Sequence, residues 1–227
     1  MLRYHKHEER WGEFVDTKIN APEILSKQLS KVKRGLIWIS SVTDPYKAVE
    51  EQYNLTRQIL QRLLSYQFPI TVLTKSRLVL RDIDIFKQFK ECDVGMTIIT
   101  MDEIARKRFE PNASTILDRL NALKTLHEAG IKTYAFIGPF LPIISEETTD
   151  ELINQLKEVG IDRVLVDKFN IKAGNSQMIR ETLNQYYPKL VEEFEYITKS
   201  HSTYYSKVKK RVPNILDEKG LEYFFCY

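Results

Sequence analysis

The chain has 227 residues, of which 43% are hydrophobic and 29% charged, an ordinary composition for one globular domain with a continuous core. Its formal net charge of +3 is too small to indicate nucleic-acid binding by itself. The longest apolar stretch, 134–144, is interrupted by a glycine and two prolines, which excludes a membrane span. Residues 1–10 are rich in charges and histidines and do not resemble a signal peptide, so we predict a cytoplasmic protein without a membrane partner.

The chain contains two cysteines, Cys92 and Cys226, which are far apart in the sequence. This count excludes a disulfide framework or a cysteine-rich metal site within the chain. We expect Cys92 to be a small core residue and Cys226 a near-terminal one. His5 and His7 are weak evidence for a metal site, and an exposed terminal helix is the simpler interpretation, so no metal ligand is predicted.

Short apolar runs alternate with helical patterns along most of the chain. The pattern predicts strands at 35–43, 70–74, 94–100, 132–137 and 163–166, separated by helices that include 22–33, 49–66 and 146–159. Strands joined by helices must be parallel and wound right-handed. We therefore predict an α/β fold, a partial (β/α) barrel of parallel strands in a single domain spanning 1–227. Trp38, inside the first predicted strand, is expected in the core.

The alternation stops beyond Gly174. Segments 177–183, 188–200 and 204–211 read as consecutive helices, and 221–227 is a candidate for a last strand. We therefore divide the domain into a barrel core, 1–172, and a helical C-terminal extension, 173–227.

Polar residues follow the predicted strands at the point where each apolar run ends. Ser41 and Thr43 lie at the end of the first strand and Asp44 follows it, Lys75 follows the second, and Thr97 lies in the third, whose apolar run ends at Thr100. The carboxyl ends of parallel strands meet at one edge, which is where α/β sheets and barrels bind ligands. The sequence therefore predicts a binding site at this edge.

Several motifs occur in a fixed order along these segments. They are the sequences FVDTKINAP at 14–22, TDPY at 43–46, TKS at 74–76, LVLRD at 78–82, VGMTIIT at 94–100, FEP at 109–111 and RL at 119–120. This ordered set resembles the radical S-adenosylmethionine proteins of the spore photoproduct lyase type, also described as DNA repair photolyase-like. The resemblance spans about 14–170, most of the chain.

The resemblance implies a partial barrel that holds a [4Fe-4S] cluster and S-adenosylmethionine, from which a 5′-deoxyadenosyl radical is generated. It also implies roles for the strand-end residues. Thr43 would contact the amino group or carboxylate of the methionine moiety, Lys75 would pair with that carboxylate, and Thr97 would hydrogen-bond the ribose or carboxylate. Asp44 is either an acceptor for the ligand or an anchor for its own turn, and we favour the turn.

The chain departs from the family pattern in two places. The CxxxCxxC loop that holds the cluster is absent, and two cysteines cannot replace it. Either Met1 is an internal methionine of a longer reading frame, the interpretation we favour, or the chain is a natural fragment without the cluster; in both cases we expect it to be inactive in radical chemistry. Ser41 occupies the place of the hydrogen-donor cysteine of spore photoproduct lyases, so the substrate stays open.

Two other function classes are compatible with the sequence. Lys75 could act as the Schiff-base amine of a cluster-independent barrel lyase. Alternatively, a non-catalytic module could bind nucleic acid through Lys209, Lys210 and Arg211. We also expect the open edge of an incomplete barrel to favour a homodimer.

Overall fold

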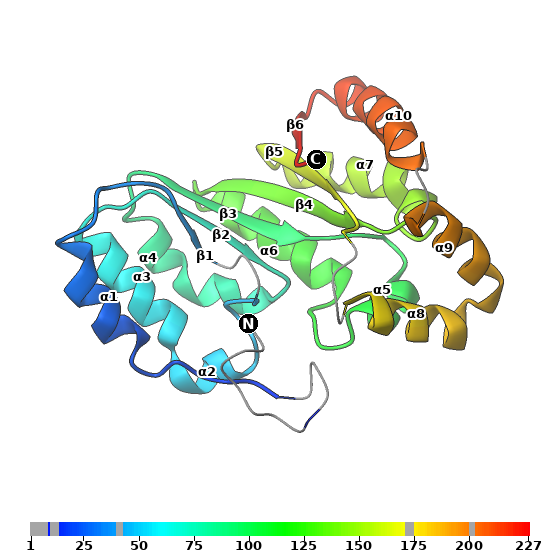
Figure 1. The fold of residues 1–227 in the computed structure, drawn as a ribbon. Coiled ribbons are helices and arrows are strands. Elements are labelled where there is room, and N and C mark those ends of the chain that lie inside the picture. The colour runs from blue at the N-terminus through cyan, green and yellow to red at the C-terminus, as the bar shows by residue number, and fades with distance from the viewer. Residues whose placement is uncertain (1–8, 10–13, 40–42, 171–174, 200–202) are drawn as a thin grey trace.

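The computed structural model describes residues 9, 14–39, 43–170, 175–199 and 203–227 (Figure 1). The predictions for Ser41, His5 and His7 lie outside these ranges. Among the described residues, no helix is both long enough and apolar enough to cross a lipid bilayer.

Six parallel strands form one sheet whose spatial order is the order of the strands along the chain. Every neighbouring pair is parallel, and the described strands do not close into a barrel. The predicted α/β fold of parallel strands is confirmed, and the segment 221–227 does contribute the last strand. The strands are β1 (Ile37–Ile39), β2 (Ile70–Thr74), β3 (Cys92–Thr97), β4 (Lys132–Phe140), β5 (Arg163–Lys168) and β6 (Glu222–Phe225).

Helices connect the strands, and most lie where the apolar periodicity predicts them. The predicted helix over 49–66 is two helices, because Asn54 adopts a left-handed conformation (φ 52°) that interrupts the α-helical hydrogen bonding. The α-helices are α1 (Ala21–Leu29), α2 (Val49–Tyr53), α3 (Leu55–Ser65), α4 (Ile83–Phe86), α5 (Glu103–Phe109), α6 (Ile116–Glu128), α7 (Thr149–Val159), α8 (Asn175–Tyr186), α9 (Val191–Lys199) and α10 (Tyr204–Glu218). Short 3₁₀-helices are η2 (Arg77–Asp82), η3 (Glu146–Thr148) and η4 (Pro188–Leu190).

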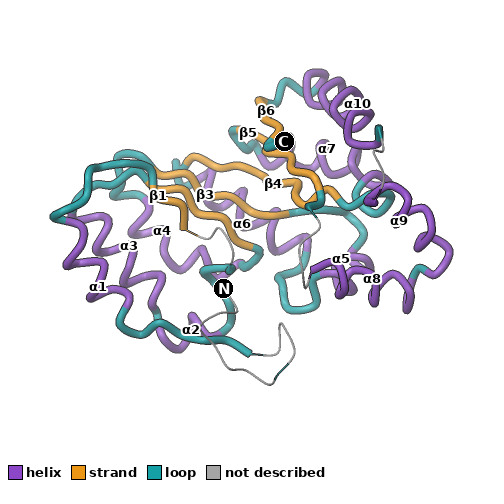
Figure 2. Tube along the Cα trace, in the orientation of Figure 1, coloured by secondary structure: helices purple, strands orange, loops and turns teal. Residues whose placement is uncertain are grey.

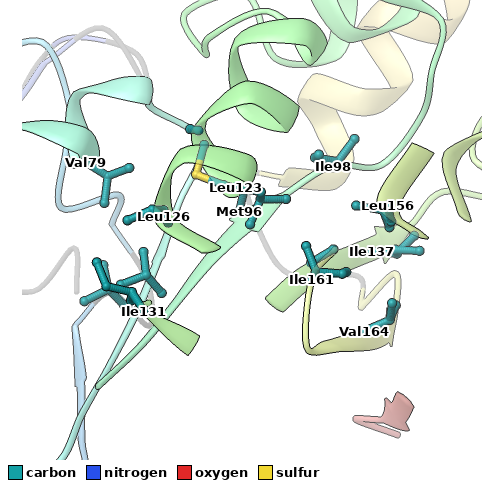
Figure 3. Close-up of a cluster of buried hydrophobic side chains, with 14 of the residues drawn as sticks. Val79, Met96, Ile98, Leu123, Leu126, Ile131, Ile137, Leu156, Ile161 and Val164 are labelled. Atoms are coloured by element: carbon teal, nitrogen blue, oxygen red, sulfur yellow. The ribbon is translucent and has the colours of Figure 1, made fainter. Parts of the chain in front are cut away.

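One face of the sheet, here called the outer face, packs against helices and forms the main core. Figures 1 and 2 show α1, α3, α4 and α6 along this side. The strand residues that belong to this core alternate with period two, for example Val94 and Met96 in β3, as expected when every second side chain points toward the helices. Figure 3 shows part of this core, which includes Val79, Met96, Ile98, Leu123, Leu126, Ile137, Leu156 and Val164, each at most 1% exposed.

The opposite, inner face carries the intervening side chains, and Trp38 is one of them. Ile37 and Ile39 pack against the outer-face core, so the side chain between them must point to the inner face. Trp38 is 53% exposed there. The prediction that Trp38 is a core residue is therefore wrong. Over a strand of three apolar residues, the sequence pattern does not show whether one face or both faces of the strand are buried.

On the inner face, Tyr134 of β4 is fully buried. A Cβ atom added at Gly95 would lie 2.3 Å from the Tyr134 ring, so the ring lies directly on the glycine of β3. The Tyr134 hydroxyl donates to the carbonyl of Val72 at 3.0 Å, and the Arg163 guanidinium lies 5.3 Å from the ring centre. This packing covers the inner face over β3.

We expect Gly95→Ala to destabilise the fold, because the added methyl group must displace the Tyr134 ring. Overpacking of this kind typically costs about 1–3 kcal/mol in the free energy of unfolding. Urea denaturation measures the change. Gly35→Ala is the matched control, since a Cβ there meets no atom within 4 Å, and an equal loss in both variants would contradict the packing argument.

Candidate binding site at the carboxyl edge of the sheet

The Asp44 carboxylate joins the loop after β1 to the end of β2. Its Oδ1 accepts hydrogen bonds from the Tyr46 amide at 2.9 Å and from the Thr74 hydroxyl at 2.7 Å. Its Oδ2 accepts from the Lys75 amide at 2.7 Å. Asp44 therefore anchors its turn, as predicted, and it also holds the main chain of Lys75.

A second carboxylate, Asp82, holds this loop through a hydrogen bond with Tyr46. Asp82 was not predicted as a site residue from the sequence. Asp82 is fully buried and accepts from the Tyr46 hydroxyl at 2.9 Å. It pairs with Arg57 at 2.8 Å and with Arg81 at 2.9 Å. The Arg81-Asp82 part of the ordered motifs is thus structural: it fixes the position of Tyr46, two residues after Asp44.

The Lys75 side chain is held at the same edge by an ion pair. Its ammonium lies 2.7 Å from Oε1 of Glu110, and 37% of the side chain is exposed. The Lys75 carbonyl accepts from the Ser114 amide at 3.1 Å. Lys75 is therefore fixed at its amide, its carbonyl and its ammonium, while part of the side chain stays open to solvent.

Glu110 bridges two cations. Its second oxygen, Oε2, lies 2.6 Å from Nη1 of Arg119, a side chain with no exposed surface. Burial raises the pKa of Glu110, but Lys75 and Arg119 outweigh this effect and hold the pKa below its ordinary value of 4.5. Glu110 is therefore an ionised, buried carboxylate at neutral pH.

Arg119 connects this ion pair to the end of β3. Its Nη1 donates to the Thr97 carbonyl at 2.8 Å, and its Nε donates to the Ser114 carbonyl at 2.9 Å. Its Nη2 is buried without a hydrogen-bond partner in the described part of the chain.

The structure places three of the predicted residues, Thr43, Lys75 and Thr97, at one edge. Thr74 pairs with Met96 in the register of β2 and β3, so Lys75 and Thr97 are next in line on neighbouring strands. Thr43 is exposed and directly precedes Asp44, which holds Lys75; Thr97 is buried. Glu110 and Arg119 complete this group. Both belong to the ordered motifs, at 109–111 and 119–120, but the sequence alone suggested no role for them.

The cysteines of this chain do not fit the [4Fe-4S] cluster that the family resemblance implies. Such a cluster requires several thiolates around one point. Cys92 begins β3 and is partly buried, whereas Cys226 follows the end of β6 and is exposed. The two thiols thus lie at opposite ends of a parallel sheet, and burial raises the pKa of Cys92 to about 12, which disfavours a thiolate. No group of three metal-ligating side chains occurs among the described residues.

The cations of the nucleic-acid alternative lie on α10, and two of them make intramolecular contacts. The Lys209 ammonium lies 4.4 Å from the centre of the Tyr227 ring, and Arg211 pairs with Glu146 at 3.1 Å. Lys210 is exposed. These contacts reduce the charge that α10 could offer to a phosphate backbone.

Comparisons with known proteins agree with the fold. No protein-family model matches the chain. An uncharacterized protein of Methanocaldococcus jannaschii, MJ0683, is 35% identical over 212 residues, which cover 93% of this chain and 76% of that protein. The "Radical SAM Nalpha-GlyT isomerase" of Pseudomonas phage M6 is 25% identical over 79% of this chain and 38% of its own length.

Two solved structures share the fold. Spore photoproduct lyase complexed with a dinucleoside spore photoproduct has a TM-score of 0.68 at 12% identity, over 91% of this chain and 66% of that one. Streptococcus suis SuiB bound to S-adenosylmethionine has a TM-score of 0.67 at 15% identity, over 94% of this chain and 45% of that one. This chain thus spans less than two thirds of the lyase and less than half of SuiB.

The fold is that of the radical S-adenosylmethionine enzymes, and the predicted resemblance to their spore photoproduct lyase type is confirmed. More narrowly, the chain belongs to the same family as the M. jannaschii protein.

We expect Asp44→Asn to destabilise the loop after β1. An asparagine has one acceptor oxygen and one donor nitrogen, so it cannot accept from both the Lys75 amide and the Thr74 hydroxyl. Leaving a partly buried donor without its acceptor costs about 1–3 kcal/mol. Chemical denaturation measures the loss, and exposed Glu218→Gln is the control for removing one negative charge.

The lowered pKa of Glu110 predicts a pH-dependent contribution to stability. The ionised carboxylate stabilises the folded state above its ordinary pKa of 4.5, and this contribution is lost as the pH falls below that value toward the folded-state pKa. The difference in unfolding free energy between the wild type and Glu110→Gln should therefore be largest near neutrality and shrink in acid. Exposed Glu147→Gln should show no such trend; a difference for Glu110→Gln that is independent of pH would contradict the assignment.

Proposed function

We propose that this chain is the S-adenosylmethionine-binding core of a radical S-adenosylmethionine enzyme. The carboxyl edge of the sheet would bind the methionine moiety, with the Lys75 ammonium on its carboxylate. Thr43 would contact the amino group or the carboxylate, and Thr97 the ribose or the carboxylate. Asp44 would act by holding Lys75, without touching the ligand.

The observation that carries this proposal is the fixed, partly exposed ammonium of Lys75 beside Thr97. A zwitterionic ligand in a partly enclosed site requires a cation in a defined position, because a desolvated carboxylate is costly unless it is paired. Spore photoproduct lyase and SuiB structures with bound S-adenosylmethionine support the same ligand class for this fold.

Radical generation is proposed for a longer form of the protein that carries a CxxxCxxC loop. The two cysteines described above do not fit the cluster, so we propose that this chain binds S-adenosylmethionine without cleaving it. We also propose that the protein acts in the cytoplasm. The relatives do not narrow the substrate to one class, because their names include a dinucleoside photoproduct and a precursor peptide. The resemblance to spore photoproduct lyase keeps a nucleic-acid-related substrate among the candidates, and the substrate class stays open.

The Schiff-base alternative requires an unprotonated amine at Lys75. In the structure this nitrogen is instead 2.7 Å from the buried carboxylate of Glu110. No contact of Lys75 in the structure favours the lyase reaction, so we retain the binding of S-adenosylmethionine as the proposed function.

Lys75→Met tests the proposal. The variant keeps the length of the side chain and removes its charge, so it should lower the affinity for S-adenosylmethionine by about tenfold or more, as loss of a charged hydrogen bond implies. Isothermal titration calorimetry of the purified chain measures this change.

Exposed Lys87→Met on the loop after α4 is the matched control and should bind like the wild type. Undetectable binding to the wild-type chain, or equal affinities for the wild type and Lys75→Met, would refute the proposed function.

A further inference from the structure

The carboxyl edge contains two buried carboxylates, each paired with two cations, but their charge balance differs. Around Asp82 there are two cations, Arg57 and Arg81, and three carboxylates, since Asp84 pairs with Arg57 at 2.6 Å and Glu50 with Arg81 at 2.9 Å. This group has no excess positive charge, and it holds the fold together without need of a ligand.

Around Glu110 the ion pairs are arranged differently. Lys75 and Arg119 give two positive charges against the one negative charge of Glu110, and the Asp44 carboxylate, bound to the Lys75 amide, adds a second negative charge nearby. The neighbouring pair of Arg106 and Glu103 adds one charge of each sign and leaves the sum unchanged. Arg119 also keeps a buried Nη2 without a hydrogen-bond partner among the described residues. Unlike the arginines around Asp82, the Lys75 ammonium pairs with one carboxylate among the described residues and lies on a side chain that is 37% exposed, which leaves it accessible to an anionic ligand.

The geometry of Glu110 suits it to control where this anion binds. Its two oxygens lie on different cations, 2.7 Å from the Lys75 ammonium and 2.6 Å from Nη1 of Arg119. Arg119 cannot shift easily, because its side chain is fully buried and is bound to the main chain of Thr97 and Ser114. Glu110 therefore links the Lys75 ammonium to an arginine whose position is fixed. An ammonium has three N–H donors, so those that do not bind Glu110 can bind a ligand.

We infer that Glu110 and Arg119 are positioning residues that hold the Lys75 ammonium where it recognises a carboxylate ligand. The inference rests on the proposed function for the identity of that ligand. The inference adds that the site recognises the carboxylate of the ligand specifically. Positive and negative groups would then alternate, in the order Arg119, Glu110, Lys75 and ligand carboxylate, so that each charge lies beside charges of opposite sign. A lysine on an untethered side chain would lose more conformational entropy when it binds.

Glu110→Asp separates positioning from charge. The shorter aspartate keeps the negative charge but cannot reach both Lys75 and Arg119. Calorimetry should compare S-adenosylmethionine with decarboxylated S-adenosylmethionine, which lacks only the carboxylate. We expect the variant to bind S-adenosylmethionine about tenfold more weakly, equivalent to about 1.4 kcal/mol, and to bind the decarboxylated compound as the wild type does. Exposed Glu147→Asp is the matched control, and thermal melting confirms that each variant is folded.

A second measurement needs no ligand. Acetylation of Lys75 by acetic anhydride, followed by peptide mass spectrometry, should be several-fold faster in Glu110→Asp and in Glu110→Gln than in the wild type, because the ammonium is released from its partner. Exposed Lys87 provides the internal reference within each sample.

The outcomes separate the two proposals. Equal weakening of both ligands in Glu110→Asp would show a merely structural role and overturn the inference, as would unchanged acetylation of Lys75. Faster acetylation together with no S-adenosylmethionine binding by the wild type would refute the proposed function and the carboxylate specificity, while the tether between Glu110 and Lys75 would stand.

Discussion

Parallel pairing of six strands in chain order fixes where the polar loops of this protein must lie. Each strand leaves the sheet at the same edge, so residues that are distant in sequence become neighbours in space without any loop having to be long. The Asp44 carboxylate turns this general placement into a defined one, because it binds the ends of two adjacent connections at once. The remaining contacts at the edge build on this link between β1 and β2.

Buried charge at the edge serves two different purposes. The arginines around Asp82 are compensated within the fold, and they secure the turn that contains Tyr46. Lys75 and Arg119 share the carboxylate of Glu110, and Lys75 reaches solvent. The partly exposed ammonium of Lys75 is therefore where the proposed anion would bind, whereas the network around Asp82 has no such exposed lysine.

The sequence by itself determined the strand–helix alternation, the parallel sheet and the strand-end positions of Thr43, Lys75 and Thr97, because period-two and helical patterns and the rule for parallel connections are local or topological. It did not determine that Trp38 lies exposed on the inner face, since burial on one face or two depends on which neighbours cover a strand. Nor could it assign Glu110 and Arg119. Their role arises from contacts across α5, α6, β2 and β3, and only the packing of those elements decides which charges meet and which remains open to a ligand.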